Sequence, residues 1–169
     1  VYFLVAIPPI LILAIPCILV LAQFNLLYGV RGIVPGQPVI VSAVVDSSVD
    51  VKKVSLVSPG NVDITPPVRD PSGKEVTWRL TVPEGEVSER SIPLSLRSGA
   101  DVFDWSLAVG ETEGKVYPSN SKAFLTQLLY PSGYRLPSWL GDLEVGYPVR
   151  VLKYGGMTID WFVLFLVVS

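Results

Sequence analysis

The stretch Glu75 to Val82, EVTWRLTV, alternates polar and apolar residues over its whole length. Successive side chains of a β-strand point to opposite faces, so this alternation predicts a strand with one face on a core and the other in water. The residues expected on the core face are Val76, Trp78, Leu80 and Val82.

Segments on both sides of this stretch have β-branched or alternating apolar patterns and are separated by turn residues. About seven or eight short strands without helical periodicity predict a mainly β fold, and we expect an immunoglobulin-like or fibronectin-type antiparallel β-sandwich. Pro93 marks its strand as an edge or bulged strand, because proline donates no ladder hydrogen bond. The further predicted strands are 39–45, 51–57, 62–65, 91–96, 102–109, 115–118 and 122–129.

The N-terminal stretch Val1 to Tyr28, VYFLVAIPPILILAIPCILVLAQFNLLY, contains no Asp, Glu, Lys, Arg or His. It exceeds the roughly 20 residues that a helix needs to cross a bilayer. Val20-Leu21-Ala22 would pass as a signal-peptide cleavage site, but we expect residues 1–28 to be retained as a transmembrane helix. A second apolar run starts at Met157, and we expect 157–169 to be the start of a second transmembrane helix.

Three prolines interrupt the first apolar stretch, at Pro8, Pro9 and Pro16. Each removes a backbone donor, so a kink is expected near Pro8-Pro9 and freed carbonyls must find other partners. Gln23 and Asn25 follow at the end of the stretch. They mark a membrane boundary in one interpretation; in the other, the kinked helix packs against further membrane helices.

Residues 29–38 have the glycines and prolines of a linker, 39–129 form the predicted sandwich, and 130–156 form an aromatic, membrane-proximal segment that completes it. Within this segment we expect one strand at 149–152 and otherwise irregular structure. Its rings, including Tyr134 and Trp139, either close the bottom of the sandwich and form an aromatic belt or provide a docking surface.

Asp160 and Trp161 lie at the entry of the second apolar run. A carboxylate at this position is either at headgroup level, as the neighbouring Trp161 suggests, or is paired with the helix of another subunit. Together with Pro8, Pro9, Pro16, Gln23, Asn25, Tyr134 and Trp139, these two residues are the candidate membrane or partner contacts.

The chain contains few of the residues that common catalytic and metal sites use. The chain has no histidine and one cysteine, which argues against conventional triads and zinc sites, and its charges are interspersed with a net of −2, which argues against nucleic acid. We therefore predict no catalytic residue, no cofactor and no metal site. Solvated carboxylate pairs in predicted loops leave calcium as a weaker alternative; they are Glu84 with Glu86, Glu111 with Glu113, and Asp142 with Glu144.

The sequence thus predicts an integral membrane protein with an extracytoplasmic domain, periplasmic or its equivalent. We expect a non-catalytic accessory or scaffolding subunit whose partners are the lipid bilayer and other integral membrane subunits. The alternative is a membrane-anchored sensor or receptor ectodomain that binds a glycan or peptide.

Overall fold

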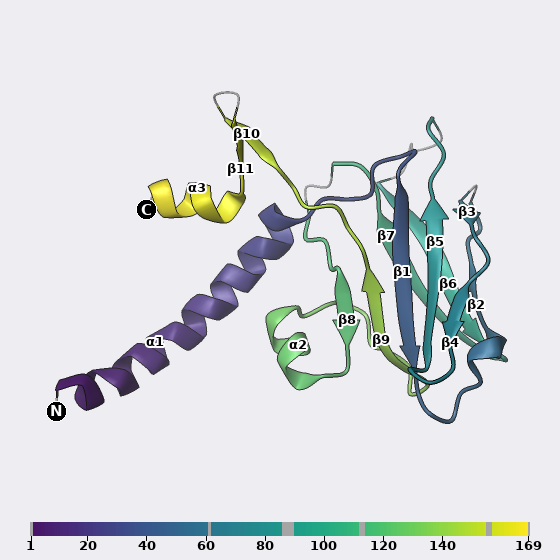
Figure 1. Cartoon of the computed structure of the whole chain (residues 1–169), viewed down its shortest axis with the longest axis horizontal. Coiled ribbons are helices and arrows are strands. Elements are labelled where there is room, and N and C mark those ends of the chain that lie inside the picture. The colour runs from purple at the N-terminus through teal and green to yellow at the C-terminus, as the bar shows by residue number, and fades with distance from the viewer. Residues whose placement is uncertain (1, 61, 86–89, 112–113, 155–156, 169) are drawn as a thin grey trace.

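The computed structural model describes residues 2–60, 62–85, 90–111, 114–154 and 157–168 (Figure 1). The chain is mainly β, with 38% of its residues in strands, and begins with a long apolar helix. Its helical elements are α1 (Tyr2–Phe24), the π-helix η1 (Asn25–Gly29), the 3-10 turn η2 (Val51–Lys53), α2 (Phe124–Leu129) and α3 (Trp161–Val168). Its strands are β1 (Pro38–Val45), β2 (Val54–Val57), β3 (Asp63–Ile64), β4 (Val68–Asp70), β5 (Glu75–Thr81), β6 (Ser91–Ser98), β7 (Asp101–Ala108), β8 (Ser119–Ser121), β9 (Leu140–Val145), β10 (Leu152–Tyr154) and β11 (Met157–Ile159).

Within the described residues, the strands form one larger sheet, one smaller sheet and a hairpin. The larger sheet has the order β3-β5-β1-β9-β8, with β4 also on β5; the smaller is β2-β6-β7, and β10 pairs with β11. The pairs that build these sheets are antiparallel. The mainly β class and the antiparallel pairing are confirmed, whereas the immunoglobulin-like arrangement stays a prediction.

The larger sheet and the smaller sheet lie face to face and share one hydrophobic core (Figure 1). The alternation predicted for β5 is confirmed, since Val76, Trp78 and Leu80 are each at most 2% exposed. Strands β6 and β7 contribute their own alternating apolar residues from the other side. Burial of these faces is the main stabilising term of the fold. We call this body, residues 33–147, the β-domain.

Strand β6 differs from the expectation of an edge or bulged strand, because it is the middle strand of the smaller sheet. Pro93 is accommodated since β2 pairs only with Ser95 to Ser98 of β6. Pro93 therefore has no partner strand on the β2 side, where no donor is needed. On the other side of β6, Pro93 pairs with Ser106 of β7.

Strand β9 lies where the sequence predicts irregular structure, since 149–152 is the one strand expected within 130–156. It pairs with β1 in the larger sheet, with a register shift between Val44 and Val45. The irregularity places Leu140, Leu143 and Val145 in the core at uneven spacing, which conceals the period of two. The predicted strand at 149–152 is replaced by an isolated bridge at Val149 and by β10.

Two predicted strands are helical over part of their length, at 51–53 and at 124–129, whereas the rest of the predicted strand 51–57 is confirmed as β2. Residues 124–129 form α2, and 51–53 form η2, where the Asp50 side chain accepts a hydrogen bond from the Lys52 N–H. The apolar residues of α2 recur as adjacent pairs four positions apart, which is a helical period rather than a strand period. No strand forms at 115–118, and β8 begins immediately after it.

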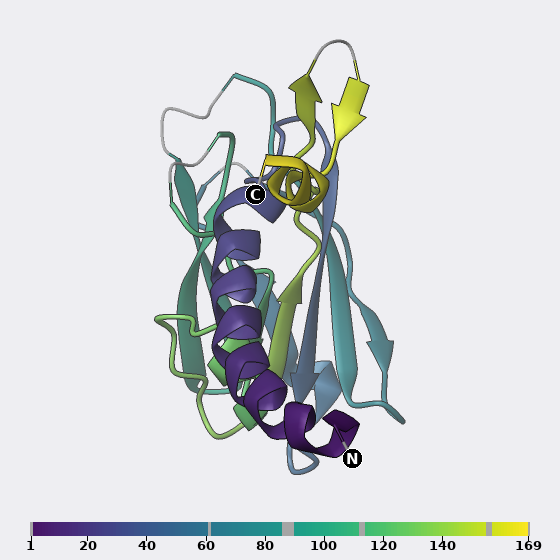
Figure 2. The same ribbon diagram turned by 90° about the vertical axis from the view of Figure 1, so that its left-hand side faces the viewer.

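In the described part of the chain, one helical stretch is long and apolar enough to span a membrane, at Ile7–Gly29. It extends away from the β-domain, and α3 lies beside its domain-proximal end (Figures 1 and 2). Whether α3 begins a second membrane span stays a prediction.

Candidate functional site

The chain enters and leaves the β-domain at one place, which we call the neck (residues 29–31 and 148–150). Val30 and Val149 form an antiparallel bridge. Around it, the Arg31 N–H donates to Pro148 O at 3.1 Å, and the Arg150 N–H donates to Gly29 O at 2.9 Å. The start of the expected 29–38 linker is therefore a paired backbone stretch.

A side-chain hydrogen bond ties the two helices together beside the neck. Trp161 Nε1 donates to Asn25 Oδ1 at 3.2 Å, between the first residue of α3 and the first residue of η1. The rings of Phe24 and Phe165 pack nearby, with 6.5 Å between their centroids. Two of the candidate contact residues, Asn25 and Trp161, are thus brought together.

Gly29 makes this close approach possible. A Cβ added to Gly29 would overlap the Asn25 side chain and come within 2.9 Å of Trp161 Nε1. Gly29 is itself buried at the end of η1. A side chain at this position would displace one of the two hydrogen-bonding partners.

The last turn of α1 is also fixed to the β-domain. Gln23 Nε2 donates to Leu129 O at 3.1 Å, and Lys115 Nζ donates to Gln23 Oε1 at 2.6 Å. Leu26 is fully buried, and its carbonyl accepts from the Val116 N–H at 3.1 Å. The polar side chain of Gln23 therefore has partners within the chain.

Pro8, Pro9 and Pro16 all lie inside α1. Figure 2 shows that the part of the helix next to the N-terminus turns away from the axis of the rest. The apolar side chains near Pro16 are exposed, with Ile12 72% exposed and Leu13 66% exposed. This face of α1 is apolar and is not covered by the described part of the chain.

Asp160 begins α3. Its Oδ1 accepts a hydrogen bond from the Phe162 N–H at 2.8 Å, and its side chain is exposed. The first N–H groups of a helix have no partner within the helix, so this bond satisfies one of them. Asp160 thus has a local structural role at the helix start.

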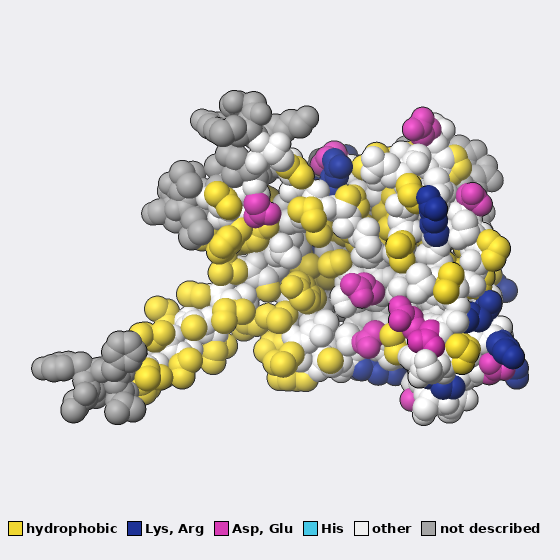
Figure 3. Space-filling model, viewed as in Figure 1, with side chains coloured by type: hydrophobic (Ala, Val, Ile, Leu, Met, Phe, Trp, Pro, Cys, Tyr) yellow, Lys and Arg dark blue, Asp and Glu magenta, His cyan; other side chains and the backbone are white. Residues whose placement is uncertain are grey.

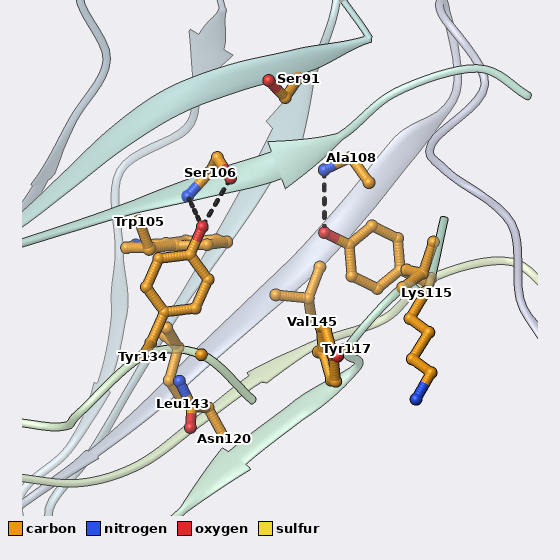
Figure 4. Close-up of a pocket in the computed structure, with 13 residues that line it drawn as sticks. Ser91, Trp105, Ser106, Ala108, Lys115, Tyr117, Asn120, Tyr134, Leu143 and Val145 are labelled. Carbon is orange, nitrogen blue, oxygen red and sulfur yellow. Dashed lines mark hydrogen bonds between the residues drawn. The ribbon is translucent and has the colours of Figure 1, made fainter. Parts of the chain in front are cut away.

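A cavity of about 450 Å³ opens between β7 and the β8–β9 edge of the larger sheet (Figure 4). Two tyrosines from the aromatic segment reach across it to the free edge of β7. The Ser106 N–H donates to the Tyr134 hydroxyl oxygen at 3.2 Å, and the Ala108 N–H donates to that of Tyr147 at 3.0 Å. These tyrosines satisfy backbone donors that would otherwise lie unpaired at the sheet edge.

Tyr147 titrates unusually. Burial raises its pKa from about 10 to about 12, although the hydrogen bond from the Ala108 N–H acts in the opposite direction. The phenol therefore stays protonated at physiological pH. This arrangement suits a structural hydrogen bond and not a general base near neutrality.

Trp139 lies elsewhere, in the core of the β-domain, where it is only 8% exposed. Its carbonyl accepts from the Asp46 N–H at 2.8 Å. Trp139 therefore packs against the chain itself, and its role as a partner contact stays a prediction.

Among the described residues, no group of three or more His, Cys, Asp or Glu side chains is placed so that it could hold a metal. Asp142 and Glu144 lie in strand β9 and not in a loop, which corrects their predicted position. Glu86 and Glu113 lie outside the described residues.

Several residues of this region were not among the predicted contacts, namely Gly29, Lys115 and Tyr147. Their partners are distant in sequence, since Lys115 and Gln23 are 92 positions apart. The sequence contained one usable signal, the glycine that directly follows the polar end of the first apolar stretch.

Comparisons with protein-family models, with curated proteins and with solved structures found no match for this chain.

Proposed function

We propose that the chain is a non-catalytic accessory or scaffolding subunit of a membrane protein complex. In this proposal α1 crosses the bilayer and α3 begins a second crossing. The β-domain, of immunoglobulin-like or fibronectin-type class, stands on the extracytoplasmic side, in the periplasm or its equivalent. Its partners are the bilayer and other integral membrane subunits.

The uncovered apolar face of α1 carries the proposal. Pro16 lacks the N–H that would bond the carbonyl of Ile12, and Ile12 is 72% exposed. In hydrocarbon a freed carbonyl is costly unless a neighbouring helix or a polar group satisfies it. A plain anchor needs no such feature, whereas a helix that packs against other subunits tolerates it.

The neck supports the same function. Backbone pairing at Val30 and Val149, together with the Asn25–Trp161 hydrogen bond, fixes the β-domain to both helices by contacts between described residues. A rigid connection suits a subunit that holds a domain at a fixed position beside its partners, because less conformational freedom is lost on assembly.

The test is purification of the tagged full chain from its native membranes in mild detergent. We expect another integral membrane protein to co-purify in fixed stoichiometry. Pro16→Ala, which restores the helical hydrogen bond, should reduce that association, while Ala100→Ser on the β6–β7 turn should not. A lone monomer in every preparation contradicts the proposal.

The second candidate is a sensor or receptor ectodomain that binds a glycan or peptide. The observation that favours it is the cavity in Figure 4, since Lys115 lines it and also donates to Gln23 of α1. Occupancy of the cavity could thereby act on the helix. Glycan and peptide libraries that show no saturable binding to the reconstituted chain would count against this candidate.

A further inference from the structure

We propose that α2 inserts its apolar side chains into the headgroup–acyl boundary of the bilayer that α1 crosses. The inference rests on the proposed membrane span of α1. It assigns to a short connection of the β-domain a direct contact with lipid, beyond the two predicted membrane helices.

The first observation is the exposure of α2. Phe124 is 74% exposed, Leu125 is 68% exposed and Leu128 is 43% exposed, all within a helix of six residues. None of the residues of α2 is buried. Three large apolar side chains that point to water from one short helix are unfavourable unless another apolar phase covers them.

The second observation is the position of α2 beside α1. The two helices are in contact, and Gln23 Nε2 of α1 donates to Leu129 O at the end of α2. In Figure 3 the hydrophobic surface of α1 continues into the part of the β-domain where Figure 1 shows α2. The apolar face of α2 is therefore continuous with the surface that is expected to contact lipid.

The third observation concerns depth. The candidate span ends at Gly29, and Gln23 lies six residues before it. An α-helix rises about 1.5 Å per residue and the π-helix η1 rises less, so Gln23 lies at most roughly 9 Å along the helix from the domain end of that span. Interfacial helices bury their apolar face about 5–10 Å into the headgroup–acyl boundary. The expected depth of α2 in the bilayer thus matches the depth at which interfacial helices are stable.

Lys122 and Gln127 agree with this placement. Lys122 precedes α2 and its Nζ donates to Ser138 O at 2.8 Å, on the side of the β-domain. Gln127 lines a hollow together with Arg135, and so its position is on the polar side of α2. The helix therefore has a polar side toward the β-domain and an apolar side away from it.

The test uses an environment-sensitive fluorophore on single cysteines of the full chain reconstituted in phosphatidylcholine–phosphatidylglycerol vesicles, with nitroxide-labelled lipids as quenchers. The native Cys17 of α1 serves as the probe within the span, and Leu125→Cys and Ala100→Cys are made in a Cys17→Ser background. Circular dichroism checks that each variant folds. Ala100 lies on the exposed β6–β7 turn and is the matched control.

We expect the probe at position 125 to be blue-shifted and to lose most of its emission to quenchers near the headgroup, whereas the probe at 100 is unaffected. A water-exposed probe at 125 with a quenched probe at Cys17 overturns the inference but leaves the span intact. Equal quenching at 125 and 100 overturns it as well. An unquenched probe at Cys17 overturns both the inference and the membrane span.

Discussion

Trp161 donates its indole N–H to the side-chain oxygen of Asn25 over 3.2 Å, although the two residues are 136 positions apart. The bond links the start of α3 to the end of the long N-terminal helix, directly beside the paired neck. It therefore joins both helical ends of the chain where the β-domain begins.

Trp161→Phe should loosen the neck while preserving most of the apolar contact. A partly buried hydrogen bond contributes about 1 kcal/mol, so amide exchange at Arg31 and Arg150 should become roughly fivefold faster. Hydrogen exchange measured by NMR in detergent micelles checks this, with the core amide of Leu80 as internal reference. Unchanged exchange at both neck amides would show that the Asn25–Trp161 bond does not stabilise the neck.

Gly29→Ala should destabilise the same junction, because the added methyl group overlaps the Asn25 side chain and crowds Trp161. Overpacking of this kind costs about 1–3 kcal/mol. Gly133→Ala is the matched control, since a Cβ there meets nothing within 4 Å. Chemical denaturation of the two variants should separate them clearly; equal midpoints would mean that the neck adjusts without cost.

Tyr147→Phe should lower the free energy of unfolding by about 1–3 kcal/mol, because the partly buried Ala108 N–H loses its acceptor. Tyr134→Phe should cost less, since water can reach the exposed Ser106 N–H. The control is Tyr117→Phe in the same cavity, because its hydroxyl makes no hydrogen bond to the described residues. Thermal melts of the three variants give the comparison. An unchanged melting temperature of Tyr147→Phe would show that the hydrogen bond from the Ala108 N–H to Tyr147 does not stabilise the fold.

Alkaline pH gives an independent test of Tyr147. Its pKa is raised in the folded chain to about 12, so the folded state holds the phenol proton more tightly than the unfolded state, where the pKa is about 10. The contribution of Tyr147 to the free energy of unfolding is fully present below a pH of about 10 and is lost as the pH rises toward about 12. The ultraviolet difference titration between wild type and Tyr147→Phe should show one phenolate forming near pH 12. A midpoint near 10 would contradict the burial of this group.

Strict alternation made two of the strands predictable. In β5 and β7 every second residue is apolar and buried, so the period of two is visible without knowledge of the partner strands. Strand β9 was missed because its register shifts beside Val44 and Val45 and breaks that period. The segment 122–129 looks strand-like in sequence, although the spacing of the apolar residues within 124–129 is helical.

The candidate site was predictable only in part. Gln23, Asn25 and Trp161 stand out in the sequence as polar or amphipathic residues at the ends of apolar runs. Their partners depend on how the sheets bring Lys115, Leu129 and Asn25 to one end of the β-domain, which no local pattern contains. The packing of Trp139 in the core likewise follows from the topology of β1 and β9.

The most direct test of the proposed function is photo-crosslinking from α1 in the native membrane. A photoreactive amino acid replaces Ile12, which is 72% exposed beside Pro16, and the same residue at Ala100 is the control. The proposal predicts a discrete adduct between position 12 and another integral membrane protein, absent from position 100 and weakened by Pro16→Ala. Adducts with lipid alone at position 12 would contradict it.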